Sequence, residues 1–446
     1  MPNLTAFGAT EYMDGALTLP VLNELFLRGA PSGGRGRPTR GRALVESHDI
    51  EEEDRERRRE CKDLEAVDLT GCVSAVFVNA FNEFVNTHLL PPSEPDSGSE
   101  DEDAPRRTRR SERNMLYEPL LFPGLQRLGM RGVKSILPRS LGPFLLAFPN
   151  LTHLDLSGTR ITPEILEAIG QSSTLSLKSL ALARCIKLTS ESIRHFLVDS
   201  PVCHELTELN LYGDMTYVSP ITPEDLVEIV TKAPCFLSGN LIYLDLSSTP
   251  IDSQILSQIK PQLQLRSLGL SHILHLGLKA VADFVRDKTP NVEILTLVNT
   301  SPELDCGIRL PTLDVRQATR QATITLHALV IRPLCNPPFQ LNLTGKAPPA
   351  VAPTRLRVVE LSTAMLGALG AGANSWRIIR SKGGRGWYVD TACAWVSEPG
   401  QGQDISVLRR DLPPTHPYRI EMCKLSDANG NVSSGVGWHA RKMEVS

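Results

Sequence analysis

The sequence lacks any apolar run long enough to cross a membrane. None of its stretches approaches about 20 uninterrupted apolar residues. The start of the chain carries Glu11 and Asp14, where a signal peptide would be basic and then apolar. We therefore predict neither a transmembrane helix nor a signal peptide. Aromatic residues make up only 5% of the 446 residues, which is low for a protein built on aromatic stacking or large apolar pockets.

The sequence also lacks a strong charge of one sign and a pattern of paired cysteines. The 47 Lys and Arg against 50 Asp and Glu leave a net charge of −3, which argues against nucleic acid or an anionic membrane as a partner. The nine cysteines are scattered, odd in number and without a C-x-x-C pair. This pattern favours reduced thiols, so we predict a cytoplasmic or nuclear protein.

The common catalytic motifs are missing. The chain has no G-x-S-x-G elbow, no phosphate-binding G-x-x-x-x-G-K-[ST], no H-E-x-x-H and no Cys/His zinc spacing. His272 and His275 could share a helix face as metal ligands, but no carboxylate or thiol is near them in sequence, so packing or surface roles are favoured. We predict no enzyme activity, cofactor or metal. The alternative is a catalytic group within residues 302–446.

A repeat runs through the middle of the chain. The pattern L-x-x-L-x-L, or V-x-x-L-x-L in its last copy, occurs six times in succession. The six copies are Leu151/Leu154/Leu156, Leu177/Leu180/Leu182, Leu206/Leu209/Leu211, Leu241/Leu244/Leu246, Leu265/Leu268/Leu270 and Val292/Leu295/Leu297. Their first positions are 26, 29, 35, 24 and 27 residues apart. The leucine-rich repeat has a unit of about 20–29 residues. The interval of 35 must therefore contain an insertion.

Each unit is predicted to be a short strand followed by a helix. The alternation x-L-x-L indicates a strand, and later apolar residues such as Ile165, Leu166 and Ile169 have helical spacing. Hydroxyl or carboxylate side chains stand at the expected helix starts. These N-cap residues are Thr162, Thr189, Thr222 and Asp252. A single unit cannot bury its leucines, so each leucine must stack on its equivalent in the next unit. The predicted fold class is an α/β solenoid.

The segment LKSLALARCIKLTSESI resembles the cysteine-containing repeat of F-box/leucine-rich-repeat proteins and of ribonuclease-inhibitor-like horseshoes, with Cys185 after the strand. Cys72 occupies the same place in an earlier unit, and both cysteines are expected to pack in turns. The resemblance covers residues 120–302. It implies a horseshoe with parallel strands on the concave face and helices on the convex face.

The same resemblance implies a substrate receptor of a cullin-type ubiquitin ligase, which would bind a ligase adaptor. No F-box is visible in the chain. The segment TLPVLNELFL at Thr18–Leu27 carries a Leu-Pro but fits a repeat strand better. An F-box could have stood upstream if the gene model is truncated. The alternative is a scaffold or regulatory repeat protein without ligase contact.

Weaker copies of the pattern extend the repeats on both sides, for about ten or eleven strands in total. They lie at Leu4/Phe7, Leu22/Leu25/Leu27, Leu64/Val67/Leu69, Leu125/Leu128/Met130 and Leu356/Val359/Leu361. Two charged inserts that are poor in apolar residues are expected to be disordered. The predicted segments are degenerate repeats at 1–30, an insert at 31–63, a repeat at 64–90, an insert at 91–114, core repeats at 115–302, an irregular insertion with possible strands at 303–355, and a last repeat with a β-rich tail at 356–446.

The tail is predicted to contain a β-hairpin. Trp376, Ile378 and Ile379 precede a glycine-rich turn, and Trp387 and Val389 follow it. We expect a small β-rich cap that closes the last repeat with bulky side chains. A tryptophan patch that binds a partner is the alternative.

The horseshoe is expected to be a monomer. The side chains between its leucines are predicted to face solvent on the concave side and to contact a protein partner. They are polar and show no cluster of one charge, which suits a protein better than a nucleic acid. The candidate contact residues are His153, Asp155, Lys178, Glu208, Asn210, Tyr243, Asp245, Arg266 and Glu293.

Overall fold

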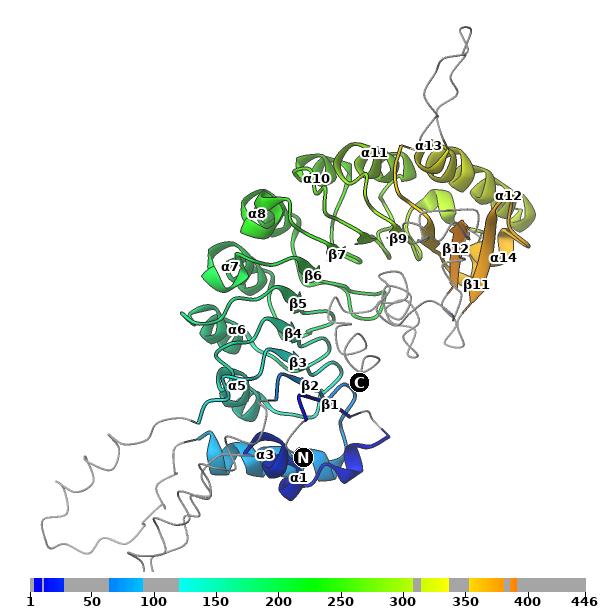
Figure 1. Ribbon diagram of the computed structural model, residues 1–446. Helices are drawn as coiled ribbons and strands as arrows, with labels where there is room; N and C mark the ends of the chain where they lie inside the picture. Colours follow the sequence, from blue (N-terminus) through cyan, green and yellow to red (C-terminus); the bar gives the residue numbers. More distant parts are fainter. Residues whose placement is uncertain are drawn as a thin grey trace, which may run out of the picture. The chain divides into compact units, whose positions relative to one another are not determined.

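The computed structural model describes residues 4–9, 12–27, 64–90, 120–307, 314–336, 353–380 and 386–390 (Figure 1). The chain divides into two compact units. The first contains Met1–Thr152 and Thr159–Leu175, and the second contains His153–Gly158 and Ser176–Ser446. Among the described helices, none has both the length and the apolar composition that a membrane crossing requires.

The first unit begins with short parallel strands: β1 (Ala6–Gly8), β2 (Ala66–Asp68) and β3 (Arg127–Gly129). The central residues Phe7, Val67 and Leu128 stand opposite one another, as the weaker copies of the repeat predict. Its helices are η1 (Asp14–Ala16), α1 (Leu19–Phe26), α3 (Ala75–His88), α5 (Pro138–Leu146) and α6 (Pro163–Gly170).

The core of the first unit is rich in phenylalanine. The ring centroid of Phe26 lies 5.4 Å from that of Phe84, 5.7 Å from that of Phe122 and 5.5 Å from that of Phe144. The Phe26 and Phe144 rings meet edge to face, a geometry that the ring quadrupoles favour. Phenylalanine rings of α1, α3 and α5 therefore meet in this core, together with Phe122.

One predicted strand is wrong. The segment Leu22/Leu25/Leu27 lies in helix α1 and its C-cap, where Thr18 is the N-cap and Pro20 stands in the first turn. Proline is compatible with this position because the first turn needs no N–H donor. Leu22 and Leu25 are buried three residues apart, which is helical spacing. Without this segment, ten parallel strands, β1 to β10, lie within the described residues.

In the second unit, seven parallel strands stack in register through one residue each, the ladder residue. The strands are β4 (His153–Asp155), β5 (Ser179–Ala181), β6 (Glu208–Asn210), β7 (Tyr243–Asp245), β8 (Ser267–Gly269), β9 (Ile294–Thr296) and β10 (Val358–Glu360). The ladder residues are Leu154, Leu180, Leu209, Leu244, Leu268, Leu295 and Val359, and each pairs with the next. All seven are buried. The predicted leucine stacking and fold class are confirmed.

The helices of the second unit follow their strands. They are α7 (Ser190–Asp199), η2 (Pro201–Cys203), α8 (Pro223–Lys232), α9 (Pro234–Ser238), α10 (Ser253–Gln258) and α11 (Leu278–Lys288). Helices α7, α8, α10 and α11 lie on the side away from the strands (Figure 1). Thr189, Thr222 and Asp252 cap their helices as predicted. Thr162 makes no such bond in the first unit.

The predicted irregular insertion is helical where it is described. Residues 303–355 contain part of η3 (Pro302–Leu304), then α12 (Val315–Leu326), the π-helical turn η4 (His327–Ile331) and α13 (Arg332–Cys335). The buried residues Ala322, Leu326 and Val330 are four apart, a spacing that places them along one face of a helix. The possible strands are not present in the described part of this segment.

The predicted hairpin is present. After α14 (Thr363–Ala368), strand β11 (Trp376–Arg380) pairs antiparallel with β12 (Gly386–Asp390), which pairs antiparallel with β10. Trp376 and Trp387 are 4% and 2% exposed, so both belong to the cap and not to a partner patch. Trp395 and Trp438, both charged inserts and the rest of the tail lie outside the described residues.

We expect Leu244→Ala to lower the free energy of unfolding by about 2–5 kcal/mol, because the removed atoms leave a cavity between neighbouring repeats. Ile242→Ala, two residues earlier at a 41% exposed position, should cost about 1 kcal/mol or less. Urea unfolding followed by circular dichroism measures both variants. Equal effects would show that the ladder is not the buried core.

Candidate functional site

The nine predicted contact residues lie on or directly before strands β4 to β9 of the second unit, but most are not exposed. Only Lys178 is exposed, and His153 and Arg266 are half-buried. The prediction that all nine face solvent is wrong for six of them. The six buried residues are Asp155, Glu208, Asn210, Tyr243, Asp245 and Glu293.

Three of the buried residues end their strands. The side-chain oxygens of Asp155, Asn210 and Asp245 each accept a hydrogen bond of 2.9 Å from the backbone N–H two residues later. A carboxylate or amide held in this way forms a local turn and cannot reach toward a partner. Asp68 makes the same contact, at 3.0 Å, to the N–H of Thr70 in the first unit. The recurrence of Asp or Asn directly after the ladder residue is the sequence signal for this turn.

The other buried side chains bond between neighbouring repeats. Ser179 on β5 donates to the Glu208 carboxylate on β6 at 2.8 Å. Glu293 forms ion pairs with Arg266 and, at 3.6 Å, with Arg355. These contacts link side chains that are 27 to 62 residues apart in sequence. We call the surface formed by the side chains on and directly before strands β4 to β9 the strand face. Its buried polar residues hold neighbouring repeats together, because burial without such partners would cost free energy.

Asp245 is the most enclosed of these carboxylates. Its side chain is fully buried, and the Tyr243 hydroxyl lies 3.5 Å from its second oxygen. Burial raises the pKa of the Asp245 carboxyl from 3.8 to about 6, and the Glu360 carboxylate adds to the rise. Gly269 stands opposite Asp245 in the next strand. A Cβ at Gly269 would collide with the Asp245 carboxylate, so glycine provides the space that this carboxylate occupies.

A row of turn residues borders the strand face. Four residues after the ladder residue, the backbone is left-handed at Gly158, Arg184, Ser248, His272 and Asn299, with φ between 55° and 69°. The N–H at this position donates to the next repeat, as in Arg184 to Tyr212 and Ser248 to Ser271. Gly71 and Gly132 have the same conformation in the first unit. Glycine at this offset was a signal available in the sequence.

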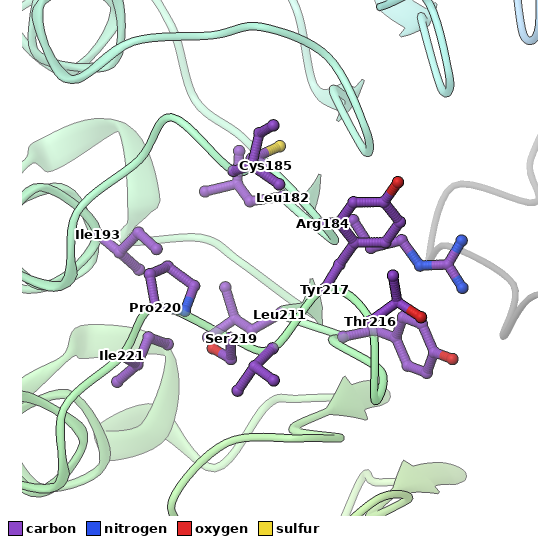
Figure 2. Close-up of a pocket in the computed structure, with 13 residues that line it drawn as sticks. Leu182, Arg184, Cys185, Ile193, Leu211, Thr216, Tyr217, Ser219, Pro220 and Ile221 are labelled. Carbon is purple, nitrogen blue, oxygen red and sulfur yellow. The ribbon is translucent and has the colours of Figure 1, made fainter.

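The insertion that the 35-residue interval between repeats predicts lies among these turns. The loop 213–221, between β6 and α8, supplies the extra residues of the 35-residue interval and lines a cavity of about 200 Å³. Ile193, Pro220 and Ile221 lie on one side of this loop cavity, and Arg184 and Tyr217 extend on the other (Figure 2). The cavity is thus apolar inside with a polar rim.

The rim of the loop cavity carries a fixed charge pair. Arg184 forms an ion pair of 2.6 Å with Asp214, and its guanidinium lies 5.2 Å from the centre of the Tyr212 ring. The Tyr212 ring also packs edge to face with His272. Because Arg184 contacts both a carboxylate and an aromatic face, it is held at the rim without adding net charge.

The described residues offer no metal site of three or more His, Cys, Asp or Glu side chains. His272 and His275 lie in the turn before α11 and not on a helix. The cysteine at the predicted turn position packs as expected, because the Cys185 thiol donates to the Leu156 carbonyl at 3.1 Å. Burial raises the pKa of the Cys72 thiol to about 12, which leaves it protonated and a poor nucleophile.

The family model described as "Leucine Rich repeat" matches residues 149–170. Among solved structures, the chain is similar to the leucine-rich repeat-containing protein LegL7 from Legionella pneumophila, with 13% identity and a TM-score of 0.33. That match covers 67% of this chain and 74% of LegL7. No curated protein matches the chain.

We expect Gly269→Ala to destabilise the second unit by about 1–3 kcal/mol, because the Asp245 carboxylate has no room to move. Alanine usually stabilises a strand relative to glycine, so a decrease in the free energy of unfolding would itself indicate the collision with Asp245. Gly277→Ala is the steric control, since a Cβ there meets nothing within 4 Å, and as the N-cap of α11 it should cost only a few tenths of a kcal/mol. Chemical denaturation compares the two variants, and a neutral Gly269→Ala would contradict the packing described here.

The stability of the protein should also depend on Asp245 and pH. A carboxyl whose folded pKa is raised stabilises the fold below its ordinary pKa of 3.8, and this contribution is lost as the pH rises through about 6. Asp245→Asn removes the titration and keeps an acceptor, as Asn210 does one repeat earlier. Relative to wild type, the variant should gain stability between about pH 4 and pH 7 in urea unfolding. If the free energies of unfolding of wild type and Asp245→Asn changed with pH in parallel, the raised pKa would be contradicted.

Proposed function

Because this chain is a leucine-rich-repeat protein, we propose that it is a non-enzymatic protein-interaction module. The observation that carries the proposal is a group of exposed apolar side chains at the loop cavity. Ile186, Tyr217 and Val218 line the cavity and are 64%, 46% and 65% exposed, and Met215 in the same loop is 58% exposed. Contiguous exposed apolar side chains are typical of surfaces that bind another protein.

The size of the loop cavity favours a protein partner over a small molecule. Its volume of about 200 Å³ is below the 300–1,000 Å³ that is usual for small-molecule sites. It suits one large side chain inserted as an anchor. The Arg184–Asp214 pair at the rim offers both a donor and an acceptor to the backbone of such a partner.

The strand face is proposed as the second part of the contact surface. Lys178, Arg266 and His153 are the predicted residues that retain exposed surface there. Arg266 is 41% exposed on its side chain while its guanidinium pairs with buried Glu293, so it is held in place for a partner. The six buried residues would act indirectly, by fixing the strands and these three side chains.

A narrower role, the substrate receptor of a ubiquitin ligase, is also part of this proposal. It is supported by the cysteine-containing repeat around Cys185, whose thiol packs in the turn as the resemblance implies. Helix α1 starts with Leu19-Pro20, but its buried residues join the core of the first unit, which favours a cap over an F-box. A scaffold role without ligase contact is the alternative. Co-capture of a cullin-ligase adaptor separates these roles.

We further propose that the protein is a monomer of the cytoplasm or nucleus. The six described cysteines are all buried thiols, which supports a reducing compartment.

The interaction proposal is tested by affinity capture of the full chain from its native cells, with quantitative mass spectrometry. We expect Val218→Asp to lose the partner by about tenfold or more, because a carboxylate at the mouth of an apolar cavity must be desolvated on binding. Leu263→Asp is the matched control. It introduces the same charge at a 53% exposed position before β8.

Both variants change exposed residues and should unfold at the temperature of wild type. The result that contradicts the proposal is the same set of captured proteins, in the same amounts, for wild type and Val218→Asp.

A further inference from the structure

A second cavity lies in the last part of the second unit, apart from the strand face and the loop cavity. It is bounded by α12, η4 and α13 on one wall and by the segment before β11 and the end of β12 on the other. Its volume is about 360 Å³, within the range that is usual for small-molecule sites. We call it the hairpin cavity.

The helical wall brings an imidazole and a guanidinium to the hairpin cavity, beside the amide of Asn336. The backbone N–H of Arg332 donates to the carbonyl of His327, five residues earlier, which defines the π-helical turn. A π-helical turn is rare and is found often at functional sites. Because it has more than four residues per turn, His327 and Arg332 line the same wall of the cavity.

The other wall contains Trp376 and is held in place by Tyr388 behind it. The Tyr388 hydroxyl lies 3.2 Å from His327 Nε2 and accepts a hydrogen bond of 3.1 Å from the N–H of Ala373. The Trp376 ring packs on Tyr388 with a centroid distance of 5.0 Å. Tyr388 thereby joins the helical wall to the hairpin, so the cavity is formed before any ligand binds.

The charges at the hairpin cavity are arranged asymmetrically. Arg332 is exposed, and no described carboxylate lies within ion-pairing distance of it. Burial and the charge of Arg332 lower the pKa of His327, so its imidazole is neutral at neutral pH and serves as a hydrogen-bonding group. Asp390 lies on the opposite wall and stands opposite Trp376 in the hairpin register. An anionic group is therefore favoured at the helical wall only.

We propose that the hairpin cavity binds a small organic carboxylate. Its carboxylate lies beside Arg332 and His327, and its apolar part packs against Trp376 and Ile331. A guanidinium and a carboxylate form charge-assisted, bidentate hydrogen bonds, which set the orientation of the ligand. This site is separate from the proposed protein-binding surface.

The test uses the full chain and three probes, phenylacetate, indole-3-acetate and hexanoate, with ligand-observed NMR and calorimetry. We expect at least one probe to bind, and phenylacetamide and benzylamine to bind more weakly than phenylacetate. Arg332→Met keeps much of the apolar stem and should weaken binding by about tenfold or more. Arg320→Met, at an exposed position of α12 that does not line the cavity, should bind as wild type does.

Thermal unfolding checks that both variants are folded, which is expected for exposed side chains. The proposal is overturned if none of the three carboxylates binds, if Arg332→Met binds them as wild type does, or if benzylamine binds more tightly than phenylacetate.

Discussion

The in-register burial of one ladder residue per strand is the interaction on which the rest of the second unit depends. The strands are three residues long, too short to persist without their neighbours. Leu180, Leu209 and Leu244 are completely buried, and each contributes roughly 1.5–3 kcal/mol through the water that it releases. A shift of one residue would expose the leucine and bury a polar side chain, so the register is fixed. The side chain that closes the strand and the left-handed turn then occur at set offsets from this residue in several repeats.

These offsets separate the stabilising positions from those that are free to vary. One residue after the ladder residue, Asp or Asn closes β4, β6 and β7, and four residues after it the chain turns in the left-handed conformation in the repeats of β4, β5, β7, β8 and β9. The loop 213–221 interrupts this regularity without disturbing the ladder, since Leu209 and Leu244 still pair. An insertion at the turn is tolerated because loop length costs little entropy. The loop can therefore expose apolar residues for recognition while the core remains unchanged.

The polar strand face shows how recognition and stability are coupled. Most of its carboxylates are engaged with side chains or backbone groups of the same or the next repeat, and Asp245 is held although burial disfavours its charge. Arg266, which is proposed to contact a partner, is held by an ion pair with the buried Glu293. A substitution at a buried acid would thus alter binding through the geometry of its neighbour.

The sequence by itself determined the elements that follow from local periodicity. The leucine spacing predicted the parallel strands, the Thr and Asp caps predicted the starts of α7, α8 and α10, and Trp376 and Trp387 around a glycine-rich turn predicted the hairpin. The spacing of Leu22, Leu25 and Leu27 fits both a strand and a helix, and only packing on the first unit's core decided for the helix. The burial of Glu208, Asp245 and Glu293 was not predictable, because their partners or enclosing residues belong to neighbouring repeats. The hairpin cavity likewise joins His327 to Tyr388 across 61 residues, a contact that exists only once the repeats have stacked.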